Sequence, residues 1–263
     1  MSAKERNLFR GAIVRPPSEN FAEGLTTAAF GRPNFALALA QHEAYCQALE
    51  DRGLELLRLP PDSAHPDSTF VEDTAVLTKQ SALLCRPGAP SRLPEVAGVR
   101  DAIRRFYRVA CEIEPPGTLD GGDVCEAGSH FFIGISHRTN EAGAGQLAQL
   151  VAADGYTSST VDIQEMKSIL HLKSGISYLD NNNLVIMEEL AGREEFAGYN
   201  LIPVSAEESY ACNCVLVNET VLIPAGFPQL AAELERRGYR TLPLEMSEFR
   251  KMDGGLSCLS LRC

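Results

Sequence analysis

The chain alternates between short runs of hydrophobic residues and longer stretches in which hydrophobic residues recur every three or four positions. The longer pattern is typical of amphipathic helices, and short β-branched runs between polar turns are typical of strands. Helical spacing predicts five helices, at residues 33–51, 95–107, 140–153, 188–196 and 227–237. Apolar runs predict strands at residues 54–59, 74–77, 81–85, 131–135, 184–187, 214–217, 221–223 and 256–261.

Several of these strands form close pairs joined by polar turns, as at Thr78-Lys79-Gln80 and Asn218-Glu219, and helices separate the pairs. No stretch has the composition of a linker or a low-complexity segment. A doubly wound sheet seldom alternates hairpins with helices so regularly. The pattern therefore predicts one α/β domain over residues 1–263, built from about five similar modules.

Length and composition narrow the class of protein. The 263 residues reach the upper limit of one domain, and 44% hydrophobic with 22% charged residues is ordinary for a soluble globular protein. No apolar run approaches the ~20 residues of a membrane span, and the charged start of the chain lacks a signal-peptide core. We therefore expect a cytoplasmic protein with no membrane partner.

Charge and glycine spacing exclude two further classes. A net charge of −11 argues against nucleic acid as a partner, because phosphate binding needs clustered Lys and Arg. The pair Gly121-Gly122 lacks the GxGxxG spacing of dinucleotide sites, and no GxxxxGK[ST] motif is present. The sequence is compatible with a homodimer.

Most of the eight cysteines fit helical or strand patterns. Without a signal peptide and without a CxxC pair, neither a disulfide framework nor a zinc site is expected. We expect buried, inert thiols at cysteines 46, 85, 111, 125, 212 and 214. Cys258 differs because it follows Gly254-Gly255, which can bring the backbone close to a ligand. That window alone leaves a buried thiol in the last strand and a reactive thiol equally open.

A nucleophilic cysteine needs a nearby base or cation, so the histidines decide between these readings. Among five histidines, His171 is the one that interrupts a strand-like run, at residues 168–172, as a rigidly held acid or base should. Asp120 and Asp123 flank the pair Gly121-Gly122. Turn chemistry alone would explain an aspartate beside glycines, whereas a functional carboxylate would orient the histidine.

Two acidic residues, Glu72 and Asp73, interrupt another apolar strand. Buried carboxylates are costly unless a cation pairs with them, and no lysine or arginine lies between residues 58 and 79. We therefore expect the cation to be a ligand. Arg92 and Arg138, in predicted loops, would suit a bidentate grip on a substrate carboxylate. Together these groups indicate a nucleophilic cysteine site for a cationic substrate.

The motifs that carry these residues, taken together, resemble the dimethylarginine dimethylaminohydrolases, in particular the bacterial members. The resemblance spans essentially the whole chain, in the same order and with similar spacing. Its motifs are Phe70-Val71-Glu72-Asp73, Arg86-Pro87-Gly88-Ala89-Pro90-Ser91-Arg92, Leu119-Asp120-Gly121-Gly122-Asp123-Val124, Arg138-Thr139-Asn140, His171-Leu172-Lys173-Ser174 and Asp253-Gly254-Gly255-Leu256-Ser257-Cys258.

This resemblance implies the pentein fold, an α/β propeller of five ββαβ-type modules around a pseudo-five-fold axis. It also implies hydrolysis of Nω-methylated arginines, asymmetric dimethylarginine and monomethylarginine, to citrulline and dimethylamine or methylamine. No metal or organic cofactor is implied. The partner is a small cationic amino-acid substrate.

The resemblance further implies a role for each matching residue. Cys258 is the nucleophile that attacks the guanidinium carbon, His171 protonates the leaving amine and then activates water, and Asp120 supports the histidine. The implied substrate contacts are Leu25 in a lid loop, Asp67, the guanidinium-binding pair Glu72 and Asp73, Arg92 and Arg138 at the amino-acid end, and the backbone of Met252.

Three rival readings use similar residues. Arginine deiminases of the same superfamily usually carry an aspartate two residues after the histidine, where this chain has Lys173, and they contain an extra helical insertion. Amidinotransferases have a longer chain. A catalytically silent binding protein would keep the fold, but the intact set of Cys258, His171 and Asp120 argues against it.

Overall fold

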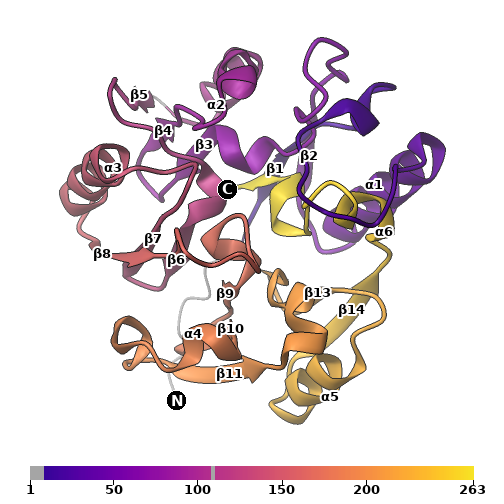
Figure 1. Ribbon diagram of the computed structural model, residues 1–263, viewed down its shortest axis with the longest axis vertical. Helices are drawn as coiled ribbons and strands as arrows, with labels where there is room; N and C mark the ends of the chain where they lie inside the picture. Colours follow the sequence, from indigo (N-terminus) through magenta and orange to yellow (C-terminus); the bar gives the residue numbers. More distant parts are fainter. Residues whose placement is uncertain (1–8, 108–109) are drawn as a thin grey trace.

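Five small three-stranded sheets surround a central axis in the computed structural model, which describes residues 9–107 and 110–263 (Figure 1). In each sheet a first strand pairs antiparallel with a middle strand, and the middle strand pairs parallel with a third. Four modules follow the chain in order: β3 (Ala75–Leu77), β4 (Ala82–Leu84) and β5 (Ala110–Glu112); β6 (Val124–Ala127), β7 (His130–Ile135) and β8 (Thr157–Asp162); β9 (Ile176–Tyr178), β10 (Asn183–Met187) and β11 (Asn200–Val204); β12 (Val215–Val217), β13 (Thr220–Pro224) and β14 (Arg240–Leu244).

The remaining module joins the two ends of the described chain. Its strands are β15 (Leu261–Arg262), β1 (Gly11–Val14) and β2 (Glu55–Arg58). Ala12 lies opposite Arg262 in the antiparallel pair of β1 and β15. This pairing closes the ring and brings the segment before β15, which carries Cys258, to the axis.

A helix connects the middle strand to the third strand in every module. Asn34 and Asn140 cap two of these helices, because their side-chain oxygens accept the Leu37 and Gly143 N–H groups at 3.0 and 2.8 Å. Figure 1 shows α1, α2, α3 and α5 on the periphery, outside the strands. The five helices are α1 (Phe35–Glu50), α2 (Ala97–Ile103), α3 (Glu141–Ala153), α4 (Glu188–Ala191) and α5 (Pro228–Arg236). The prediction of five ββαβ modules in a pentein fold is confirmed.

A short 3-10 helix precedes the first strand of each module, and these turns lie around the axis. Helix η2 contacts η8 and η4, η4 also contacts η5, and η5 contacts η7. The turns are η2 (Val71–Thr74), η4 (Gly121–Asp123), η5 (Leu172–Ser174), η7 (Ala206–Cys212) and η8 (Ser257–Leu259). The motif residues of the sequence therefore meet at the centre of the molecule, although they are far apart along the chain.

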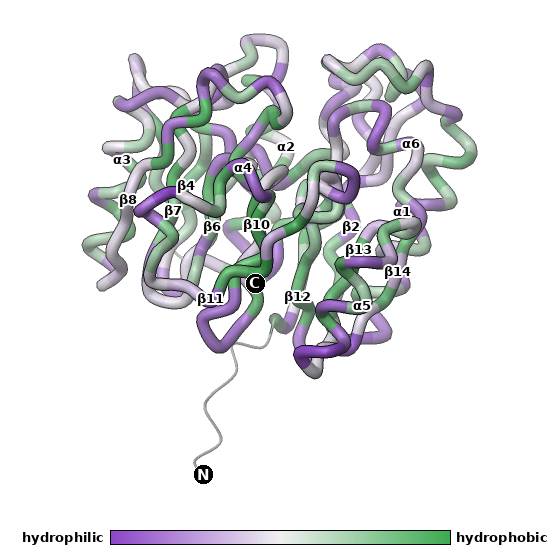
Figure 2. Tube along the Cα trace, turned by 60° about the horizontal axis from the view of Figure 1, so that its bottom comes forward, coloured by the Kyte–Doolittle hydropathy of each residue, from purple (hydrophilic) through white to green (hydrophobic). Residues whose placement is uncertain are grey.

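The hydrophobic core consists of four clusters, each of which joins residues from neighbouring modules. Figure 2 shows hydrophobic residues concentrated along strands such as β10 and β12, and hydrophilic residues in the connecting loops. Each fully buried Leu, Ile or Phe side chain contributes about 1.5–3 kcal/mol relative to exposure. Packing between modules thus fixes the ring on which the central residues depend.

Two predicted strands are wrong, and both carry a candidate catalytic residue. Residues 256–261 form η8 before the two-residue strand β15, because the Ser257 N–H donates to the Asn213 side chain rather than to a neighbouring strand. Residues 168–172 form no strand: the Leu172 N–H donates to the Asp123 carboxylate at 3.0 Å, and η5 starts there. Glu72 and Asp73 likewise lie in η2, just before β3, instead of interrupting a strand.

Other differences concern the outer strands and one further helix. The sequence pattern missed β8, β11 and β14, whose residues are partly exposed because each lies at the edge of its sheet. It also missed β1, β6 and β9 and the short helix α6 (Ser247–Arg250). The predicted helix 95–107 divides into the 3-10 helix η3 (Pro90–Val96) and α2. Across the described parts of the chain, no helix has the length and apolarity needed to cross a membrane.

The predicted buried cysteines are confirmed at five positions: 46, 85, 125, 212 and 214. Cys111 is exposed, so its prediction is wrong, because β5 is an edge strand with an open face. All eight cysteines are free thiols.

Candidate active site

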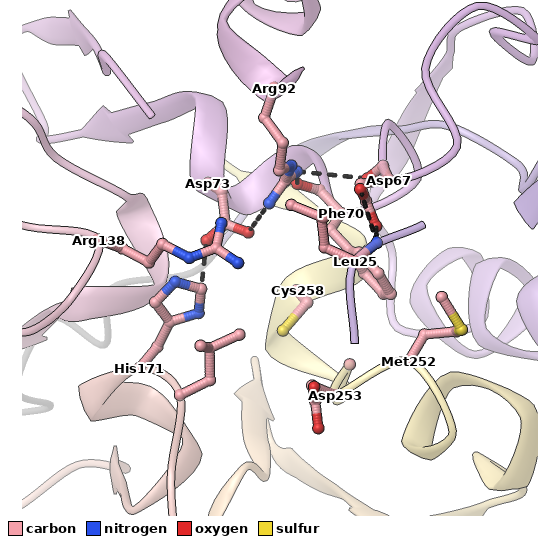
Figure 3. Close-up of a pocket in the computed structure, with 12 residues that line it drawn as sticks. Leu25, Asp67, Phe70, Asp73, Arg92, Arg138, His171, Met252, Asp253 and Cys258 are labelled. Carbon is pink, nitrogen blue, oxygen red and sulfur yellow. Dashed lines mark hydrogen bonds and ion pairs between the residues drawn. The ribbon is translucent and has the colours of Figure 1, made fainter. Parts of the chain in front are cut away.

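A small cavity at the centre of the ring brings together eight of the ten site residues predicted from the sequence. Its volume of about 20 Å³ is enough for a water molecule but not for an amino acid. Figure 3 shows His171 and Arg138 on one side, Met252 on the other, Cys258 between them and Asp253 below Cys258. The lining residues are Leu25, Asp67, Phe70, Asp73, Arg92, Arg138, Leu170, His171, Met252, Asp253, Gly254 and Cys258.

The Cys258 side chain enters the cavity from η8, and its Sγ accepts the Gly255 N–H at 3.4 Å. Burial, together with the negative charges of Glu72 and Asp73, raises the pKa of this thiol to about 12. The nucleophile is therefore a protonated thiol at neutral pH. A side chain at Gly254 would collide with the Phe70 ring, so the glycine pair permits the close packing of this loop.

His171 is held by carboxylates on both sides of its ring. Its Nε2 donates to Asp120 Oδ2 at 3.0 Å, and its Nδ1 lies 4.0 Å from Asp73 Oδ1. Burial lowers the pKa of His171, but Asp73, Asp123 and Asp120 outweigh burial and raise the pKa to about 9. The side chain is therefore an imidazolium at neutral pH, charged and ready to give up a proton.

The histidine's supporting carboxylate is itself fixed by hydrogen bonds. Asp120 Oδ1 accepts the Gly88 N–H at 2.8 Å, which leaves Oδ2 directed at His171. Gly122 allows this arrangement, since a Cβ there would lie 2.8 Å from His171 Nδ1 and 2.8 Å from Asp73 Oδ1. The geometry fits the supporting role that the family resemblance implies for Asp120, although Asp120 does not line the cavity.

The second aspartate that flanks the glycine pair, Asp123, is not among the site residues predicted from the sequence. Asp123 is fully buried and accepts hydrogen bonds from Ser136 Oγ, Thr139 Oγ1 and the Leu172 N–H, at 2.6, 2.7 and 3.0 Å. Burial raises its pKa to about 6. Asp123 thus fixes the backbone directly after His171. Its place on the far side of the glycine pair from Asp120 was the available signal.

The cations that pair with Glu72 and Asp73 belong to the protein, so the expectation that a ligand supplies them is wrong. Asp73 Oδ2 lies 2.5 Å from Arg92 Nη1. Glu72 pairs with Lys173 and lies 3.6 Å from Arg262 Nη2. All three cations come from distant parts of the chain, which is why the local sequence did not reveal them.

Only one member of the predicted guanidinium-binding pair lines the cavity. Successive residues of a 3-10 turn point about 120° apart, so Asp73 faces the cavity while Glu72 faces away. The Glu72 carboxylate accepts the Ser257 hydroxyl at 2.8 Å and lines a larger hollow of about 1610 Å³, together with Lys173. Glu72 is therefore placed to support the loop of Cys258 rather than to touch a ligand in the cavity.

The two arginines expected at the amino-acid end differ in what they already bind. Arg92 is buried in η3, not in a loop, and its guanidinium binds Asp73, Glu95 and two backbone carbonyls. Arg138 has one acidic neighbour, Asp120, at 4.0 Å, and its side chain is 17% exposed. Arg138 thus retains donors for a carboxylate, whereas Arg92 holds Asp73 in place.

A loop of residues 24–34 contributes Leu25 to the lining of the cavity and is tied to the segment before Cys258. The Thr27 N–H donates to Asp253 Oδ2 at 2.6 Å, and the Arg250 guanidinium lies 4.7 Å from the centre of the Phe30 ring. At the other end, both oxygens of Asp67 accept the Leu25 N–H at 3.1 Å, as Figure 3 shows. Leu25 lies in this loop and lines the cavity, and its role in a lid stays a prediction.

One group of side chains in the described chain has the spacing of a metal site. Ligand atoms of Asp73, Asp120 and His171 all lie within 4.8 Å of one another. These atoms are already engaged, since Asp120 binds His171 and Asp73 binds Arg92. The arrangement suits a proton-transfer site with a charged histidine.

Comparisons with known proteins point to one enzyme family. A family model described as arginine deiminase matches residues 94–215. The N(G),N(G)-dimethylarginine dimethylaminohydrolase of Pseudomonas aeruginosa is 43% identical over 97% of this chain and 100% of its own length. The solved structure of a cysteine-to-serine mutant of dimethylarginine dimethylaminohydrolase from Pseudomonas aeruginosa, complexed with citrulline, matches with a TM-score of 0.94 at 42% identity. That match covers 97% of this chain and all of the other.

A second solved structure, an adduct of a dimethylarginine dimethylaminohydrolase histidine-to-glycine variant with S-methyl-L-thiocitrulline, matches with a TM-score of 0.93 at 42% identity, over 97% of this chain and all of the other. Sequence similarity and architecture thus agree over nearly the full chain. By both criteria, this chain belongs to the dimethylarginine dimethylaminohydrolase family.

Proposed function

We propose that this protein hydrolyses Nω-methylated arginines to citrulline and dimethylamine or methylamine, through a covalent intermediate on Cys258. One observation supports this most directly: a neutral, partly buried thiol and a charged histidine line the same cavity as the carboxylates of Asp73 and Asp67. The substrate is a small arginine derivative. A guanidinium is resonance-stabilised, so a covalent route that divides the barrier into two smaller steps suits it.

Substrate binding would use the charged side chains that face the cavity or that have unoccupied hydrogen-bond donors. Asp73 and Asp67 supply negative charge to a cavity from which Glu72 is turned away. Arg138, whose donors are largely unoccupied, would receive the substrate's carboxylate, and Arg92 would keep Asp73 oriented. The lid residue Leu25 would close over the amino-acid end once the substrate has entered.

The first chemical step forms a bond between sulfur and carbon. The bound guanidinium lowers the pKa of Cys258 by Coulomb attraction, the thiol proton passes to solvent, and the thiolate attacks the guanidinium carbon. The imidazolium of His171 gives its proton to the methylated nitrogen, and the carbon–nitrogen bond breaks. Dimethylamine or methylamine leaves, the enzyme carries a cationic thiouronium, and His171 becomes neutral.

The second step returns the enzyme to its starting state. Neutral His171 takes a proton from water, and the resulting hydroxide adds to the thiouronium carbon. The carbon–sulfur bond then breaks, citrulline forms, and the sulfur recovers a proton. Asp120 and Asp73 stabilise the charged histidine each time it forms, because both are fixed beside its ring.

The state of the Cys258 thiol gives a prediction for pH. In the free protein the thiol has a pKa of about 12, so thiolate absorbance should rise only at strongly alkaline pH. Saturation with an unreactive cationic amidine should lower this pKa by at least about one unit, since an opposite charge within a few ångströms shifts pKa values by 1–3 units. Ultraviolet titration, with Cys258→Ser as the blank, measures this. An unchanged pKa would contradict substrate-assisted ionisation.

Substrate preference gives a second prediction and tests the proposed function. Lys173 neutralises Glu72, and the cavity offers the apolar side chains of Phe70, Leu170 and Met252 beside its carboxylates. Arginine deiminases usually carry an aspartate at the position of Lys173, but here the Lys173 side chain lines the larger hollow beside Glu72 rather than the cavity. Methyl groups would fit this lining, whereas plain arginine would leave a polar N–H against apolar groups, at a cost of about 1–3 kcal/mol.

We therefore expect kcat/KM for monomethyl- or asymmetric dimethylarginine to exceed that for arginine about tenfold or more. Citrulline release from each substrate measures it. Equal or greater efficiency with arginine would favour an arginine deiminase, the family whose model matches residues 94–215.

A cytoplasmic location, a homodimer and a single catalytic domain over residues 1–263 stay predictions.

A further inference from the structure

The repeated modules leave one central position without a role. Four of the turns around the axis supply a residue of the proposed mechanism: Asp73 in η2, Asp120 before η4, His171 before η5 and Cys258 in η8. The fifth turn, η7, is followed by Asn213, which lies just before the first strand of its module, β12. Pseudo-symmetry therefore directs attention to Asn213, which nothing in its sequence context had marked.

Asn213 is 4% exposed, and its amide makes three hydrogen bonds. Its Nδ2 donates to the Lys173 carbonyl and to Ser257 Oγ, both at 2.9 Å. Its Oδ1 accepts the Ser257 N–H at 2.9 Å. Both donor hydrogens of the amide are thus used. Lys173 comes two residues after His171, and Ser257 comes directly before Cys258.

These contacts form a closed circuit. Ser257 Oγ accepts from Asn213 and donates to Glu72, Glu72 pairs with Lys173, and the Lys173 carbonyl accepts from Asn213. A side chain at Gly255 would collide with the Asn213 amide, so the backbone of the Cys258 loop is packed directly against it. Asn213, which directly follows η7, thus links Lys173 in η5 to Ser257 in η8.

We propose that Asn213 is a positioning residue that sets the separation and orientation of the His171 and Cys258 side chains during the reaction. The inference rests on the proposed function. Asn213 does not line the cavity, so it acts through the two segments that it bridges. Proton transfer to the leaving amine requires a fixed distance and orientation between the His171 ring and the carbon bound to the Cys258 sulfur. A misplacement of about 1 Å costs about 10²-fold in rate.

The variant Asn213→Asp tests this at unchanged side-chain size. An oxygen replaces Nδ2, so the donors to the Lys173 carbonyl and to Ser257 Oγ are both lost, and an acceptor faces the Lys173 carbonyl oxygen. We expect kcat to fall about 10- to 100-fold while KM for methylarginine stays within about twofold. The unpaired buried acceptors should lower the thermal midpoint, so kcat is compared at a temperature at which both proteins are folded, which separates a positioning effect from a loss of folded protein.

A second variant keeps the inference testable if Asn213→Asp fails to fold. Ser257→Ala removes the hydroxyl contact to Asn213 but keeps the contact from its backbone N–H, so a smaller loss in kcat is expected. Residues of one hydrogen-bond network are not additive, so the losses of the double variant should not simply multiply. Independent, multiplicative losses would contradict a shared circuit.

The matched control is Asn183→Asp on β10. The Asn183 amide also donates through Nδ2, to Tyr239 Oη at 2.8 Å, but neither residue lines the cavity. This variant should keep wild-type kcat. An equal loss in both variants, or wild-type kcat in Asn213→Asp, would overturn the inference.

The rate at which a haloamidine labels Cys258 separates this inference from the proposed function. Wild-type protein that releases no citrulline would refute the function, whereas labelling still reports the position of the thiol. Slower labelling of Cys258 in Asn213→Asp than in Asn183→Asp would support the inference. Equal labelling rates together with equal kcat would refute it.

Discussion

Replacing Cys258 with serine should abolish citrulline release, with a loss in kcat on the order of 10⁶-fold, as for other enzymes that lose a covalent nucleophile. The serine hydroxyl is far less acidic than the thiol, so the bound guanidinium cannot ionise it. The side chains are close in size, and Cys258 makes one weak contact, to the Gly255 N–H. Folding and binding of a cationic substrate should therefore be retained, as calorimetry would show.

Two other thiols provide matched controls for this result. Cys111 is exposed and Cys263 is partly exposed, and neither lines the cavity. Cys111→Ser and Cys263→Ser should keep wild-type kcat, and a haloamidine should modify Cys258, as peptide mapping can establish. Covalent labelling at another cysteine with Cys258 unmodified would move the nucleophile elsewhere.

Replacing His171 with glycine should lower kcat by at least about 10²–10⁴-fold, the contribution typical of general acid–base catalysis. Without the imidazolium, the methylated amine must leave without a proton, and no group activates water. Added imidazole should restore part of the rate if the role is proton transfer. His137→Ala is the control, since His137 does not line the cavity, and an equal loss there would refute this assignment.

The same histidine predicts the alkaline limit of activity. His171 must be protonated when the amine leaves, and its pKa is raised from 6.5 to about 9. The charged histidine therefore persists through neutral pH and is lost as pH rises through about 9. Because the Cys258 thiol must lose its proton to solvent before it attacks, we expect kcat/KM to rise with pH through neutrality and to stop rising near about 9, where His171 loses its proton. A rise that stops near pH 6.5 would show that the carboxylates do not hold the charged histidine.

Much of the fold followed from sequence pattern because the modules are local. Helical spacing located α1 and α3, and apolar runs located middle strands such as β7, β10 and β13, since these elements bury one clear face. The edge strands β8, β11 and β14 escaped because their residues are partly exposed, and β11 and β14 contain Pro203 and Pro243. Their positions depend on pairing with a neighbour, which periodicity does not report.

The sequence by itself determined which chemical groups the site contains. Its motifs named Cys258, His171, Asp120 and Asp73, because a thiol, an imidazole and carboxylates beside glycines are unusual in apolar surroundings. The resemblance to the family then implied how these groups work together. Each residue in this set was recognisable from its own local segment.

Only the tertiary structure decided the partners and the directions of these groups. Asp73 is held by Arg92, Glu72 is turned from the cavity to Lys173 and Ser257, and Asn213 bridges the segments of the histidine and the thiol. Those contacts join segments up to 185 positions apart, and they exist because the ring closes through β1 and β15. The protonation states of these groups also depend on the tertiary structure. Burial raises the pKa of Cys258, and three aspartates raise the pKa of His171. The local sequence encodes neither environment.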